Sequence, residues 1–115
     1  MENTFHLVHI GINQGSTAEA EKLAQTLSLM FNLAPRQGQK SVYAGDYFEC
    51  MRAPYLGTMG HIAMGTPDLE AAVAEMKEKG FTFREDTAQY DDEGKLKNIY
   101  LDGEFGGFAI HILRR

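Results

Sequence analysis

Three histidines and one glutamate are the residues of this sequence whose types and setting could carry chemistry together. Each histidine lies in a short, largely apolar segment, and Glu49 follows Phe48 in a segment of the same kind. A carboxylate buried there without a partner would be costly. Three imidazoles and one carboxylate suit a borderline divalent ion such as zinc, nickel, cobalt, manganese or iron. The candidate metal ligands are His9, Glu49, His61 and His111.

Strand alternation tests whether these side chains share a face. In residues 6–13 (HLVHIGIN), Val8 and Ile12 fall on one face, which we expect to pack on a helix. His9 then points to the opposite face, beside Gly11. The same reasoning places the other two candidate histidines on the face away from the helices, beside glycine or alanine: His61 and His111. A curved sheet with imidazoles and small residues on its concave face forms a cavity wall.

The alternative is that each polar residue is satisfied by ordinary hydrogen bonds. For a single histidine this alternative is the more common case, whereas agreement across both units makes the two interpretations about equal for the set. His6 falls on the helix-side face and is left out. Four tyrosines are candidates for lining a pocket, although aromatic strand residues more often simply pack: Tyr43, Tyr47, Tyr55 and Tyr100.

One strand–helix unit is used twice along the chain. In residues 59–80 a strand turns at Thr66, a candidate N-cap, and Pro67 into a helix that ends at Gly80. In the first unit Ser16, with Glu19 three residues on, forms a candidate capping box. The remaining expected strands are 40–45, 46–52, 81–85, 96–102 and 108–113, with a very short strand within 36–40 and an acidic turn at 86–95. We predict an α+β fold of two βαβββ modules, 1–53 and 59–115, joined by a linker at 54–58.

Composition restricts the function classes. The 115 residues suffice for one domain, and 43% hydrophobic with 23% charged residues is typical of a globular protein. A net charge of −5 without a basic stripe argues against nucleic-acid binding. No apolar run is long enough for a membrane helix, no signal peptide is evident, and the single Cys50 fits a reducing compartment, so we expect a cytoplasmic protein.

The chain resembles the vicinal oxygen chelate superfamily, which includes glyoxalase I, extradiol dioxygenases and fosfomycin-resistance proteins. The resemblance rests on VHIGIN, on GHIAMGTPDLEAAVAEMKEKGF and on GGFAIHIL. It implies a curved mixed sheet around a metal-holding cleft, with ligands from the first, fourth, fifth and eighth strands. In this chain those positions are His9, Glu49, His61 and His111. At the position of His111 the superfamily usually has a carboxylate, which can also transfer the proton in glyoxalase-type isomerisation. The resemblance therefore does not by itself imply that reaction.

A second, looser resemblance is to small glyoxalase-like domains associated with bacterial keto-hydroxyglutarate/keto-deoxy-phosphogluconate aldolases. It rests on the segments APYLGTMGHIA, TAQYDDEGKLKNIYL and GGFAIHI. The chain lacks the length and the buried lysine of such an aldolase, so the resemblance implies a role near 2-oxo acids and not aldolase chemistry.

Two functions follow from this sequence. The first is a metal-dependent lyase, isomerase or oxygenase on a small 2-oxo acid or other oxygenated metabolite, with Glu49 as the candidate proton-transfer residue. The second is a metal-free binding or accessory domain. The short linker with Pro54 also predicts a homodimer, because it hinders the pairing of the two modules within one chain.

Overall fold

The computed structural model describes residues 2–115, which form two helices and eight strands. The first half contains β1 (His6–Asn13), α1 (Thr17–Phe31), β2 (Pro35–Gln37), β3 (Ser41–Ala44) and β4 (Phe48–Met51). The second half contains β5 (Gly60–Thr66), α2 (Leu69–Glu78), β6 (Phe83–Tyr90), β7 (Leu96–Leu101) and β8 (Phe108–Arg114). No helix among these residues is both long and apolar enough to cross a membrane.

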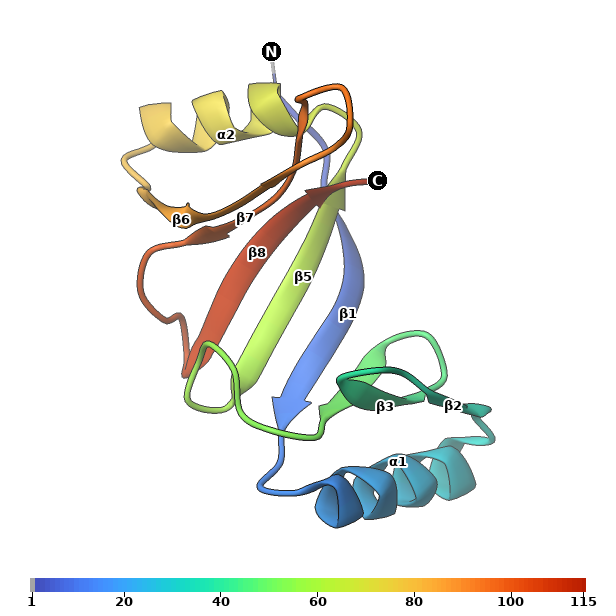
Figure 1. Cartoon of the computed structure of the whole chain (residues 1–115). Coiled ribbons are helices and arrows are strands. Elements are labelled where there is room, and N and C mark those ends of the chain that lie inside the picture. The colour runs from blue at the N-terminus through green and yellow to red at the C-terminus, as the bar shows by residue number, and fades with distance from the viewer. Residues whose placement is uncertain (1) are drawn as a thin grey trace.

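All eight strands join one mixed sheet in the order β2-β3-β4-β1-β5-β8-β7-β6. Each half contributes a βαβββ unit, in which β1 pairs with β4 and β5 pairs with β8 in parallel. The two units meet where β1 and β5 pair antiparallel, so β1, β5 and β8 lie side by side at the centre (Figure 1). The predicted α+β fold with two βαβββ units is confirmed.

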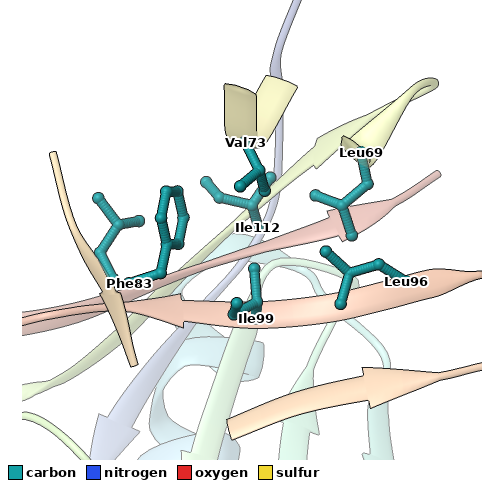
Figure 2. Close-up of a cluster of buried hydrophobic side chains, with 7 residues drawn as sticks. Leu69, Val73, Phe83, Leu96, Ile99 and Ile112 are labelled. Atoms are coloured by element: carbon teal, nitrogen blue, oxygen red, sulfur yellow. The ribbon is translucent and has the colours of Figure 1, made fainter. Parts of the chain in front are cut away.

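Each helix covers its own half of the sheet. The main contacts of α1 are with β2, β3 and β4, whereas α2 contacts β7 and β8, so the helices lie far apart (Figure 1). The apolar face predicted for α2 is confirmed, because Leu69 and Val73 are buried against Ile99 and Ile112 (Figure 2). A separate core lies beneath α1 and includes Ala20, Ala24, Val42, Ala44 and Cys50.

The helix ends agree with the sequence prediction in part. The Glu19 N–H donates to Ser16 Oγ at 3.1 Å, which confirms the N-terminal cap of α1. The cap of α2 is Asp68 and not Thr66, because Asp68 Oδ1 accepts from the Ala71 N–H at 3.1 Å. Helix α1 stops at Phe31, after which Asn32 takes the left-handed conformation that commonly ends a helix.

Two predictions for the strands are wrong. The polar segment 86–95 is not all turn, because β6 continues to Tyr90 and only the residues around Asp91 to Lys95 reverse the chain. In β1, a register shift between Leu7 and His9 breaks the strict alternation. Val8 therefore lines the same cavities as His9.

The first strand also does not pack on a helix as expected. Because α1 lies over β2, β3 and β4, the outer face at the centre of the sheet has no helix over it. Ile10, Ile12 and Ile62 on that face are only half-buried.

Candidate metal centre

The four side chains selected from the sequence converge within one chain. His9 Nε2 and His61 Nε2 each lie 3.1 Å from the same carboxylate oxygen, Glu49 Oε1. The two Nε2 atoms are also 3.1 Å apart. One ring nitrogen from each of His9, His61 and His111 lies within 4.8 Å of the others. These residues come from β1, β4, β5 and β8, so the cluster straddles the junction between the two units.

The spacing of these atoms fits the ligand shell of a small divalent ion. Ligands at 2.0–2.1 Å from a tetrahedral ion lie about 3.4 Å from one another. The three separations of 3.1 Å are close to that edge length. Two imidazole nitrogens and a carboxylate oxygen, with a third imidazole beside them, are also the donor types that zinc and its neighbours prefer. The residues present therefore fit such an ion.

Glu49 is held as a carboxylate by its neighbours. Its second oxygen, Oε2, accepts a hydrogen bond from Ser41 Oγ at 2.7 Å. Burial raises the pKa of the Glu49 carboxyl, but the hydrogen bonds from His61, His9 and Ser41 outweigh burial and hold that pKa well below its usual range. A carboxylate so stabilised is a good ligand and a weak proton acceptor.

His111 presents an unprotonated nitrogen to the cluster. Its Nδ1 lies 2.6 Å from Asn98 Oδ1, which can only accept, so Nδ1 carries the proton. The Asn98 amide N–H in turn donates to Gln89 Oε1 at 3.3 Å, an arrangement in which Asn98 Oδ1 faces His111. The other nitrogen, Nε2, is buried without a hydrogen-bond partner. Burial, together with His61 and His9, lowers the pKa of His111 to about 3, so Nε2 keeps its lone pair at neutral pH.

Gly11 makes room for the His61 ring. The two residues are direct partners across β1 and β5, and a Cβ at position 11 would lie 2.0 Å from His61 Cε1. Only glycine is compatible with this placement, as the small residues in the sequence predicted. His6, which the alternation excluded, lies near Gly65 on the cleft side because of the shift in β1, but it does not join the cluster.

A cleft opens over the cluster on the face away from the helices. One part of it is a cavity of about 240 Å³, walled by the cluster and by Tyr55 and Tyr100. Tyr100 stacks on His111 with ring centres 4.6 Å apart. The remaining lining residues of this cavity are Lys40, Met51, Thr87, Gln89 and Asn98.

Two site residues were missed in the sequence, although strand alternation could have found them. Ser41 lies two residues before Tyr43, which pairs with Glu49 across β3 and β4. Asn98 lies two residues before Tyr100, which pairs with His111 across β7 and β8. Residues two apart in a strand share a face, so both belong beside the candidate ligands.

Comparison with known proteins identifies the fold. No protein-family model matches the chain, and no curated protein matches it by sequence. Among solved structures, a hypothetical protein from Bacillus halodurans C-125 superposes with a TM-score of 0.64 and 18% identity, covering 97% of this chain and 95% of the other.

Methylmalonyl-CoA epimerases also match. The selenomethionine form of one superposes with a TM-score of 0.61 and 16% identity over 99% of this chain and 98% of the other. A variant of the Streptomyces coelicolor enzyme in complex with 2-nitronate-propionyl-CoA gives a TM-score of 0.59 and 16% identity, covering 95% and 93%. The comparisons give no support to an association with aldolases. The chain therefore has the fold of these structures, the glyoxalase-like α+β fold that its sequence predicted.

Proposed function

We propose that this protein is a divalent-metal-dependent enzyme acting on a small oxygenated metabolite such as a 2-oxo acid. One observation carries the proposal. Two histidines and a carboxylate meet at 3.1 Å, and beside them the buried His111 Nε2 has a lone pair and no partner. An orphaned buried nitrogen is costly unless something accepts its lone pair, and a metal ion would do so.

Each group of residues in the site would have a distinct role. His9, Glu49, His61 and His111 would hold the ion, which when bound supplies Lewis-acid polarisation of a substrate carbonyl or enediolate oxygen. Ser41 and Asn98 orient two of these ligands from behind. The aromatic side chains of the cavity would exclude water from the bound substrate.

The reaction is one of three alternatives, that of a lyase, an isomerase or an oxygenase. Glu49 is the candidate for proton transfer, but the contacts that hold it as a weakly basic carboxylate favour its role as a ligand. Some proteins of the same fold, the methylmalonyl-CoA epimerases, act on a CoA ester. At their low identity to this chain, that likeness supports the fold and leaves the substrate open.

Metal analysis of protein purified without an affinity tag tests this proposal. We expect about one divalent ion per chain, with cobalt giving the intense visible bands of a low-coordinate site. If no divalent ion is bound in an amount equal to that of the protein, the proposal is contradicted. That result would favour instead a metal-free binding domain whose concave face holds the ligand directly.

The amide of Asn98 provides a sharper prediction. Asn98→Leu removes the acceptor for the His111 Nδ1 proton, so the imidazole loses its fixed tautomer and orientation. We expect the metal affinity to fall about 10–100-fold, the usual cost of losing such a partner. Asn98→Asp keeps an acceptor oxygen and serves as the matched control. Competition titrations against a chelator measure both variants, and equal affinities would show that Asn98 does not position His111.

We further infer that the protein is a homodimer of complete sites. The uncovered outer face at Ile10, Ile12 and Ile62 is an apolar surface that a second copy would bury. Exchange of modules between chains is not needed, because β1 and β5 of one chain already pair, and His9, His61 and His111 lie together there with Glu49 beside them. Light scattering should give twice the mass of the chain. Mixing His9→Ala with His61→Ala chains should restore no metal binding, whereas recovery would indicate exchanged modules.

A further inference from the structure

The cleft continues past the metal centre to a basic end. Cavities of about 400 Å³ and 380 Å³ lie where β1 begins and β8 ends, and both are lined by Val8, His9, Tyr43 and Arg115. Because they share these residues, the two cavities adjoin, and both reach the candidate metal centre at His9. Three further cations line them: Arg36 in the first cavity, and Lys97 and Arg114 in the second. Of these, Arg114 is already paired with the Asp91 carboxylate.

Three cations of this basic end lack a carboxylate partner: Arg36, Lys97 and Arg115. Within residues 2–115, five of the eleven Lys and Arg side chains lie within 4.0 Å of a carboxylate, and these three do not. Of the six unpaired cations, four line the cleft and only Lys22 and Lys95 lie outside it. A chain with a net charge of −5 would readily pair them elsewhere. Their exposure toward one cleft points to an anionic ligand.

Arg36 is oriented for such a ligand. Its guanidinium carbon lies 4.1 Å above the centre of the Tyr43 ring, and stacking in this way leaves the N–H groups at its edge free. Because the centres of the Tyr43 and His9 rings are 6.1 Å apart, the guanidinium is no more than about 10 Å from His9. An anion held there is therefore within one small molecule's length of the metal centre.

We propose that the basic end binds the phosphate group of a small phosphorylated metabolite whose oxygenated end reaches the metal centre. The contact between the oxygenated end of the metabolite and the metal ion rests on the proposed function. The anion site itself is inferred from the three cations alone. A phosphomonoester carries about two negative charges and three acceptor oxygens, which match two guanidinium groups and one ammonium group. A single carboxylate would leave this charge under-compensated, since the only acidic residue lining these cavities is Asp46.

The same distance limits the size of the metabolite. Three bonds of an extended chain span about 3.8 Å, so about 10 Å corresponds to roughly six to eight bonds. The ligand that fits is a phosphomonoester of a short carbon skeleton that carries neighbouring oxygens at its far end.

Titration with methyl phosphate and with acetate, followed by NMR of the arginine Nε–H groups, tests this site in metal-free and zinc-loaded protein. At pH 8 the phosphate is dianionic. We expect methyl phosphate to shift the Arg36 and Arg115 signals in both forms and to bind at least about fivefold more tightly than acetate. Arg36→Gln with Arg115→Gln should weaken binding at least about tenfold, whereas the matched control Lys22→Gln with Lys95→Gln should change it less than about twofold.

Three outcomes would overturn the inference. One is no saturable binding, and another is acetate binding as tightly as phosphate. The third is phosphate binding that needs zinc and is unchanged in the arginine variant, which would place the phosphate on the ion. A protein that binds methyl phosphate at the arginines but takes up no metal would contradict the proposed enzyme function and leave the anion site standing.

Discussion

His61→Ala should abolish stoichiometric metal binding and leave the protein folded. His61 Nε2 contacts both Glu49 and His9 at 3.1 Å, so its loss removes the residue that links the two halves of the cluster. Loss of a ligand should cost more than the roughly 10–100-fold that loss of an outer partner costs. Metal titration measures the affinity, and circular dichroism with thermal melting reports the fold.

The matched control for this variant is His6→Ala. His6 lies in the same cleft but outside the cluster, so its removal tests whether any cleft histidine matters for the ion. We expect wild-type affinity for this variant. Equal losses in the two variants, or a His61→Ala protein that retains one tightly bound ion per chain, would show that the cluster is an ordinary hydrogen-bonded network.

Val73→Asp should unfold the domain. The Val73 side chain is 8% exposed and points into the core beneath α2 with Leu69, Ile99 and Ile112 (Figure 2). A carboxylate there would be desolvated without a partner and would also leave the valine contacts unmade, at a combined cost of about 3–5 kcal/mol. That loss is a large part of the stability of a small domain. Urea denaturation measures it.

Ala74→Asp places the same carboxylate one residue further along α2, on its exposed face. We expect this variant to change the free energy of unfolding by less than about 0.5 kcal/mol, as surface substitutions usually do. If Ala74→Asp proves the more damaging of the two, the buried and exposed faces of α2 have been interchanged.

Strand alternation predicted the cluster correctly because β5 and β8 follow it throughout and β1 follows it from His9 onward. In β5 the face of His61 also holds Ala63 and Gly65, while in β8 Ala109 lies two residues before His111. Small residues beside an imidazole mark an open cleft, and apolar residues of normal size mark the opposite face. The pairing of β5 with β8 in register then brings the marked faces together.

Features that depend on tertiary contacts could not be predicted from the sequence. The shift in β1 that turns Val8 toward the cleft has no glycine or proline to announce it. Pro54 stiffens the linker, yet the two modules pair within one chain. The linker is held at the end of β1, where the Asn13 side chain donates to the Gly57 carbonyl at 2.9 Å and accepts from the Tyr55 N–H at 3.4 Å. The placement of α1 over β2, β3 and β4 depends on which strands lie beside β1, and that order is not encoded locally.

The junction of β1 and β5 divides the hydrophobic interior in two. One core lies under α1 and the other under α2, and neither of these two helices bridges the cores. Cooperative unfolding of the whole chain therefore relies mainly on the pairing of β1 with β5. A smaller link is made by Asn3, whose backbone and side-chain N–H groups donate to Glu75 of α2 at 2.7 Å and 2.8 Å. An ion held by His9 and Glu49 on one side and His61 and His111 on the other would act as a clasp across this boundary. Its binding free energy would be added to the cost of separating the halves, turning two weakly coupled folding units into one.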